Sequence, residues 1–222
     1  MYDLINDITE DIEILDEMSY NEILRKQRSI TSLFPQFYSR VDQVGKKGGV
    51  RLKSLQKDRW LFKVHSGTKD DVWYDVILQF DNVLPVIKKH VYDRRLWKKD
   101  RTGVDLRKLA KVVLFDIDFK VSCSDPSFLY WGMDYIVTKR GAKSGEPEDR
   151  RPKIRNPKEY GSLCKHLQLA FNVLPAYITT FAKYLNKLYS KQIIAFENEV
   201  KAEDAKLKQA TDLLKQKSEE EN

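Results

Sequence analysis

Three short segments rich in β-branched and aromatic residues follow one another at residues 50–55, 59–66 and 72–80. Each shows partial two-residue alternation of apolar and polar side chains, and turn residues separate them. Such segments are typical of an antiparallel meander. The sequence on both sides instead repeats its apolar residues every three or four positions, which is the period of a helix. We therefore predict an α+β fold with N-terminal helices, a small antiparallel sheet and long C-terminal helices.

The first segment combines a helical pattern with an unusual polar face. Its apolar residues share one side, and every charged side chain on the other side is an acid. The apolar residues are Leu4, Ile5, Ile8, Ile12 and Leu15. Such a stripe must find a groove, either on the chain's own body or on a neighbouring molecule, and the sequence leaves both open. A second helix is predicted from a Ser19 cap to Pro35.

The middle of the chain is predicted to alternate between helices and strands. Asp81 is expected to cap a short helix over residues 82–91, and a further short helix is expected over 104–110. Residues 111–123 predict a strand because their apolar side chains alternate. Residues 128–138 predict a second, buried strand because they are almost all apolar or aromatic.

The C-terminal third begins with a charged segment and then becomes helical. Residues 139–157 hold three prolines, two glycines and many charges, which predicts a long exposed loop. A helical pattern follows from Lys158, with a kink expected at Pro175. We divide the chain into three parts. They are an N-terminal helical arm (1–44), an α+β body (45–190) and a charged C-terminal helix or tail (191–222).

Charge is distributed unevenly along the 222 residues, whose net charge is +7. Residues 1–18 carry seven acids and no Lys or Arg, whereas residues 196–222 carry eight acids and five lysines, so the segment between them carries +17. A strongly basic body attracts nucleic acid or acidic protein surfaces, and an acidic arm suits the basic patch of a neighbouring copy. Solubility alone is the simpler explanation.

The densest basic cluster surrounds Trp97 in residues 93–101. An aromatic side chain among cations suits phosphate contact combined with base stacking, and the rim of an interface with an acidic protein fits the pattern equally well. The candidate contact residues are Arg94, Arg95, Lys98, Lys99 and Arg101.

Two pairs of metal-ligand residue types, each pair separated by one residue, lie about forty residues apart. Cys123 and Asp125 form the first pair, and Cys164 and His166 form the second. Brought together by a strand end and a helix start, they would form a tetrahedral zinc site. The alternative is a buried thiol and a helix-start imidazole that pack without metal. The N-terminus lacks the layout of a secretion signal, which favours free thiols or metal ligands over a disulfide.

The segments around these pairs resemble a known motif. Cys123-Ser-Asp-Pro-Ser-Phe128, followed by Asn156-Pro-Lys-Glu-Tyr-Gly161-Ser-Leu-Cys164-Lys-His166-Leu, is similar to the ligand layout of SWIM-type zinc fingers. In particular it resembles a variant in virion proteins of tailed bacteriophages, crAss-like phages among them. The resemblance covers residues 112–185 and implies a structural zinc site in a virion protein. Asp125 stands where the pattern has a cysteine.

Catalysis is not expected from this sequence. The chain has three histidines and no glycine-rich phosphate loop, G-x-S-x-G or H-E-x-x-H motif. Asp116 and Asp118 are predicted on one strand face, where two-metal nucleases place such pairs, although a solvated strand face is the more common reason. No segment is apolar enough to span a membrane.

Two functions are expected from these features. The first is a structural virion protein that oligomerises around the portal axis as a head-tail connector, portal-ring component or tail adaptor. Its partners would be copies of itself, the portal, neighbouring neck and tail proteins and DNA, and its locations the virion and, during assembly, the host cytoplasm. The second is a nucleic-acid-binding accessory protein. It would use a zinc-finger-like module, the 93–101 cluster and further cations at Lys139, Arg140, Arg150, Arg151, Lys153 and Arg155.

Overall fold

A computed structural model describes residues 49–56, 58–67, 69–154 and 163–220, with side chains up to residue 216. The predicted N-terminal helices, and with them the whole 1–44 arm, lie outside the described residues. The rest is α+β, as predicted. It divides into two compact units, one that includes Asp116–Pro175 and the strands before Asn82, and one formed by Asn82–Phe115 and the chain from Ala176 onward.

The first unit is built on a four-stranded antiparallel sheet in the order β1-β2-β3-β4. The predicted meander is confirmed as β1 (Val50–Gln56), β2 (Arg59–His65) and β3 (Trp73–Asp81), and β4 (Asp118–Cys123) pairs with β3. Alternate side chains of the central strands are fully buried because they face the core. They are Trp60, Phe62, Val64, Val76 and Leu78.

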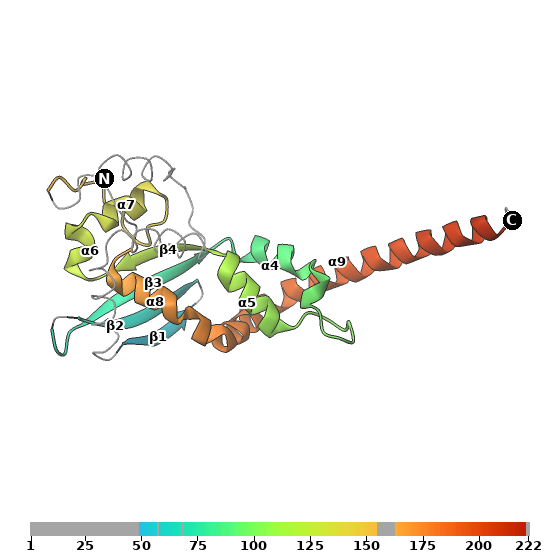
Figure 1. Ribbon diagram of the computed structural model, residues 1–222, viewed down its shortest axis with the longest axis horizontal. Helices are drawn as coiled ribbons and strands as arrows, with labels where there is room; N and C mark the ends of the chain where they lie inside the picture. Colours follow the sequence, from blue (N-terminus) through green and yellow to red (C-terminus); the bar gives the residue numbers. More distant parts are fainter. Residues whose placement is uncertain (1–48, 57, 68, 155–162, 221–222) are drawn as a thin grey trace, which may run out of the picture. The chain divides into compact units, whose positions relative to one another are not determined.

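Helix α8 (Lys165–Val173) covers one face of this sheet and contacts all four strands (Figure 1). Its buried residues Leu167, Ala170 and Phe171 recur at spacings of three and one, which places them on one helical face. Phe171 packs edge-on against Phe119 of β4, with ring centroids 5.3 Å apart. This contact places the C-terminal half of α8 beside the start of β4.

The strand predicted over 111–123 is half wrong. Helix α5 (Leu106–Asp116) extends through its first half, and only β4 is extended. One helical face is formed by the buried residues Leu109, Ala110, Val113 and Leu114. The sequence prediction divided this face between a helix ending at 110 and a strand beginning at 111. Asp116 therefore ends a helix while Asp118 begins a strand, so the two do not share one strand face.

The strand predicted over 128–138 is wrong. This segment forms α6 (Pro126–Tyr130) and α7 (Met133–Lys139), which are joined at Gly132. Asp125 caps α6, because its side chain accepts a hydrogen bond from the Ser127 N–H, and Pro126 suits the first turn. A buried strand and a helix cannot be told apart from an apolar run without clear periodicity. Here the Asp125 cap starts the first helix and Gly132 separates it from the second.

The segment predicted as an exposed loop is partly tied to the sheet. Val121 of β4 donates its N–H to Ala142 O (2.7 Å), and Ser144 N–H donates to Val121 O (3.0 Å). Further along, Glu148 N–H donates to Thr138 Oγ1 (3.0 Å). The described part of this segment therefore follows the free edge of β4 and returns over α7.

The second unit contains α4 (Val83–Val91), the 3₁₀ turn η1 (Arg94–Leu96), most of α5, and α9 (Ile178–Glu220). Another 3₁₀ turn, η2 (Leu174–Tyr177), precedes α9 and contains Pro175, so the α-helix is interrupted at the residue where a kink was predicted. The boundary predicted at residue 190 falls inside α9. Among the helices in the described parts of the chain, none combines the length and apolar character needed to cross a membrane.

We predict that Gly132→Ala destabilises the protein more than Gly145→Ala. Both glycines have positive φ (68° and 94°), which costs an alanine about 1–2 kcal/mol. A Cβ at Gly132 would also lie 2.2 Å from Pro152 Cγ, whereas nothing lies within 4 Å of one at Gly145. Overpacking adds about 1–3 kcal/mol at Gly132. Urea unfolding of both variants measures the difference, and equal losses would contradict the Gly132–Pro152 contact.

Candidate metal centre

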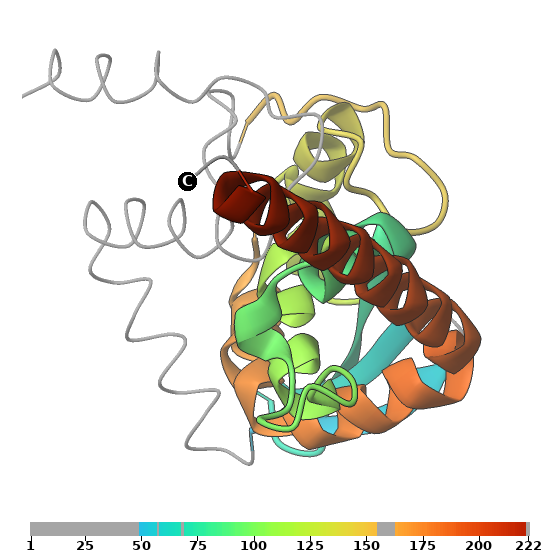
Figure 2. The same ribbon diagram turned by 90° about the vertical axis from the view of Figure 1, so that its right-hand side faces the viewer.

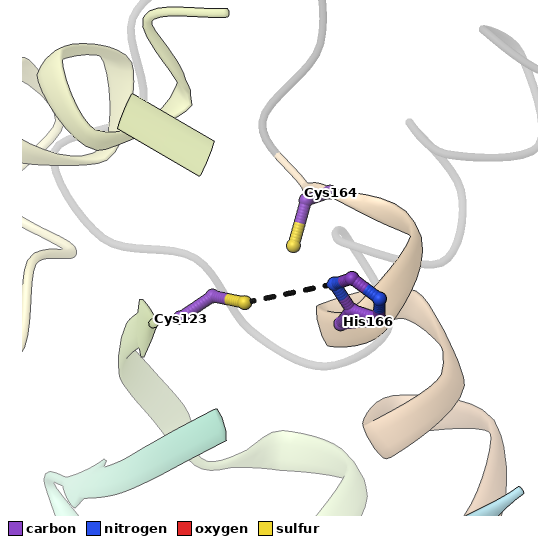
Figure 3. A group of neighbouring side chains, drawn as sticks. All are labelled: Cys123, Cys164 and His166. Atoms are coloured by element: carbon purple, nitrogen blue, oxygen red, sulfur yellow. Dashed lines mark hydrogen bonds between the residues drawn. The ribbon is translucent and has the colours of Figure 1, made fainter. Parts of the chain in front are cut away.

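Four side chains meet where β4 ends and α8 begins. Cys123 is the last residue of β4, and Cys164 is the N-cap of α8, where its Sγ accepts a hydrogen bond from the Leu167 N–H (3.5 Å). His166 lies in the first turn of α8. Figure 3 shows the Cys164 sulfur pointing toward the space between Cys123 and His166. The predicted pairs are therefore brought together by a strand end and a helix start.

The donor atoms are close enough to share one metal ion. Sγ of Cys123 lies 3.9 Å from Nδ1 of His166, and the donor atoms of Cys123, Cys164 and His166 all lie within 4.8 Å of one another. Zinc bonds of about 2.0–2.3 Å in a tetrahedron separate neighbouring ligands by roughly 3.3–3.8 Å. Cys164 and His166 are buried and Cys123 is partly buried. This group could hold a metal ion after small adjustments.

Asp125 lies next to this group and has two other contacts. Its Oδ2 is 3.1 Å from His166 Nδ1, and its Oδ1 accepts the Ser127 N–H (3.0 Å) that caps α6. Ser127 Oγ also donates to its carboxylate. Asp125 therefore joins His166 to the start of α6, and His166 Nδ1 faces both Asp125 and the Cys123 sulfur.

The charges within the cluster compensate one another. Burial raises the pKa of Asp125, but hydrogen bonds from His166 and Ser127 outweigh burial and lower this pKa to about 2. Burial lowers the pKa of His166, but contacts with Asp125 and Cys164 raise it above its ordinary value. Without metal, a carboxylate and an imidazolium therefore form a buried ion pair.

The two thiols differ in acidity. The hydrogen bond to Cys164, followed by burial, raises the pKa of Cys123 well above its ordinary value. Burial also raises the pKa of Cys164, but hydrogen bonds with Cys123 and His166 lower it to about 6. Cys164 is therefore the thiolate of the pair. A metal ion would have to displace the protons of Cys123 and of His166 Nδ1.

The second nitrogen of His166 gives no support to metal binding. Ligating histidines usually donate their other ring N–H to a carboxylate, carbonyl or water. Here Nε2 is buried, and it has no hydrogen-bond partner within the ranges that the structure describes. The Tyr74 ring packs against the imidazole, with centroids 4.7 Å apart. The donor set fits a metal ion, whereas the surroundings of Nε2 differ from the usual pattern.

The arrangement of the basic cluster around Trp97 does not support base stacking on this residue. Trp97 is only 6% exposed, and its Nε1–H donates to Val91 O (2.8 Å). Arg94 and Lys201 lie over its ring, with the Arg94 Cζ 4.9 Å and the Lys201 Nζ 5.7 Å from the centroid. Arg94 also donates to Asp204 (2.6 Å). The ring is therefore part of the packing between η1 and α9 and offers no face to a base.

Arg95 pairs with Asp93, which leaves three predicted cations in the loop before α5. They are Lys98, Lys99 and Arg101, and all are exposed. Helix α5 adds exposed cations that sequence reasoning did not combine with them, namely Arg107, Lys108 and Lys111. Their spacing of three and four residues would have placed them on one helical face, but the sequence pattern predicted Lys111 in a strand.

The other predicted cations are in the first unit. Arg140 is buried, and Arg150 binds Glu148. Arg155 lies outside the described residues. These side chains therefore belong to a different unit from the cations of the loop before α5.

The described structure is thus an α+β protein with a buried sulfur and nitrogen donor cluster between a strand end and a helix start. Comparisons with protein-family models, with curated proteins and with solved structures found no match. We therefore infer function from the residues, their geometry and the motif resemblance.

We predict that Asp125→Ala lowers stability while Asp125→Asn keeps the α6 cap. Loss of a capping side chain costs about 0.5–2 kcal/mol, and Asn caps nearly as well as Asp. Asn removes only the negative partner of His166. Metal titration of the two variants then separates the two functions of Asp125. If Asp125 is a ligand, both variants bind metal more weakly than the wild type, and unchanged affinity in both would exclude it as a ligand.

Proposed function

We propose that this protein is a structural virion protein of a tailed bacteriophage, a connector, portal-ring or tail-adaptor component that assembles with copies of itself. The motif resemblance supports the virion setting. The observation that carries the assembly function is the apolar surface of α9. Leu207, Leu213 and Leu214 are 69%, 60% and 68% exposed on this helix. Clustered exposed leucines on one helix are typical of an interaction surface.

The length of α9 supports the same proposal. The helix has 43 residues, about 65 Å at 1.5 Å per residue, whereas α4, which packs on it within the second unit, has nine. Within this unit, Arg94 of η1 forms an ion pair with Asp204 of α9. Helix α9 runs well past α4 of the same unit (Figure 1), and Figure 2 views it from its C-terminal end.

We propose zinc as the metal of the cluster, with Cys123, Cys164, His166 and Asp125 as its ligands. Two thiolates and an imidazole are donors that zinc prefers, and a carboxylate completes a tetrahedral set. Such a site would join the end of β4 to the start of α8, across a connection of about forty residues. With four protein ligands it leaves no position for a substrate, so its function would be structural and the protein non-enzymatic.

The alternative function is binding of nucleic acid at the basic surface of the second unit. The observation that favours it is a set of six exposed cations on the loop before α5 and on α5 itself, Lys98, Lys99, Arg101, Arg107, Lys108 and Lys111. In the described part of the chain, none of them forms an ion pair. The neighbouring acids Asp100 and Asp105 accept local hydrogen bonds instead. Unpaired cations of this density suit phosphate contact, without base stacking by Trp97.

Native mass spectrometry of the full-length protein, with zinc quantified in the same sample, tests the proposal. We expect an oligomer that persists at high ionic strength, because apolar contacts are insensitive to salt, and one zinc per chain. A metal-free monomer that binds DNA with steep salt dependence would contradict the proposal and favour the alternative.

We predict that His166→Asn removes the bound zinc and lowers the melting temperature, whereas His90→Asn does neither. The two variants make the same chemical change, but His90 lies on α4 in the second unit and is not one of the proposed ligands. Each kcal/mol of stability corresponds to about 2–4 °C for a chain of this size. Metal analysis and thermal unfolding measure both effects. Zinc retained in His166→Asn would contradict the ligand assignment.

A further inference from the structure

One face of α9 carries an apolar residue at every seventh position. The residues are Ile193, Val200, Leu207 and Leu214. Ile193 and Val200 are 4% and 0% exposed, whereas Leu207 and Leu214 are 69% and 68% exposed. A seven-residue apolar repeat is the seam along which one helix packs on another. The same seam is therefore covered in its first half and uncovered in its second.

Packing within the second unit surrounds Val200 in the first half of the seam. Glu199 binds Lys88 (3.3 Å) and Tyr92 (2.9 Å), and Arg94 binds both Val200 O (3.0 Å) and Asp204. These contacts border Val200. Beyond Asp204, no described residue of another element covers Leu207 or Leu214. The uncovered seam therefore continues an established helix interface, which we call the distal seam of α9.

Charge around the distal seam favours an acidic partner. Residues 205–216, which include Leu207 and Leu214, contain three lysines, Lys206, Lys208 and Lys215, and one acid, Asp212, and the last helical residues, 217–220, add one lysine and two acids. Two copies of this segment packed together would bring like charges close, which is unfavourable. A helix with an acidic polar face would instead pair with the lysines. The charges thus favour a partner other than a second α9, while the apolar seam supplies most of the free energy of association.

The N-terminal segment has the matching pattern. Ile5, Ile8, Ile12 and Leu15 follow one another at spacings of three, four and three, which is the seam of a packed helix. Its charged side chains are seven acids. As a helix of 18 residues it would be about 27 Å long, close to the roughly 24 Å of residues 205–220. This segment lies outside the described residues, so its pattern comes from the sequence.

We propose that residues 1–18 of one copy dock as a helix on the distal seam of a neighbouring copy. The inference rests on the proposed assembly function and names the contact through which copies join. Leu207 and Leu214 pack against Ile5, Ile8, Ile12 and Leu15. Lys206 and Lys208 pair with the acids of the arm.

Carbodiimide cross-linking tests the contact, because it couples carboxylates to amines that already touch. Isotopically heavy and light full-length chains are mixed, unfolded, refolded together and cross-linked. We expect peptides that join residues 1–18 of a heavy chain to Lys206 or Lys208 of a light chain. Cross-links within one chain only would overturn docking on a neighbour. An oligomer without cross-links from residues 1–18 to α9 would overturn the contact while leaving the proposed assembly function intact.

Charge-matched variants make the test specific. Leu207→Asp with Leu214→Asp places two acids in the distal seam, and Gln209→Asp with Gln216→Asp places two acids on the opposite face of the same helix at the same spacing. All four residues are exposed, so neither pair disturbs a core. We expect the first pair to abolish the heavy–light cross-links and weaken association about tenfold or more, and the second to retain both. Equal effects of the two pairs would overturn the proposal.

Discussion

Phe119 of β4 and Phe171 of α8 pack edge-on, and Phe119 also packs against Phe80 of β3, with centroids 5.7 Å apart. Phe119 and Phe171 are no more than 1% exposed. This row of aromatic rings packs the C-terminal half of α8 on the start of β4. At the other end of α8, Cys164 caps the first turn and His166 lies within it, and the ring of Tyr74 from β3 packs against His166. Contacts at both ends of α8 therefore bring these side chains to Cys123. The candidate metal centre is a consequence of how the first unit packs.

The cluster has two chemically distinct ways to be stable. Without metal, the His166 imidazolium interacts with both the Asp125 carboxylate and the Cys164 thiolate, which leaves one negative charge uncompensated, and Cys123 donates to Cys164. Buried ion pairs of this kind are costly to desolvate and stabilise a fold only when their geometry is good. A zinc ion would replace two protons and bind the sulfurs directly. The same four residues therefore support both states, and the donor set and the motif resemblance favour zinc.

The sequence predicted features that depend on local patterns. The meander followed from alternation, the turn at Pro175 from proline chemistry, and the gathering of Cys123, Asp125, Cys164 and His166 from their spacing. Other features depend on tertiary packing. The run at 128–138 has no periodicity that separates strand from helix, so it was assigned wrongly. Trp97 is buried by contacts with Val91 and with Lys201 of α9. Lys201 is more than a hundred residues away in the sequence, so no local pattern could have predicted this burial.

The two units carry different features: one carries the cluster that stabilises the fold, and the other carries the surfaces proposed for contact with other molecules. The first unit holds the donor cluster, while the second holds the exposed cations and the distal seam of α9. Electron microscopy of the purified full-length protein tests the central claim, which is that this chain assembles with copies of itself. The account predicts closed rings with rotational symmetry. Single particles of one chain, at all concentrations and with zinc supplied, would contradict it.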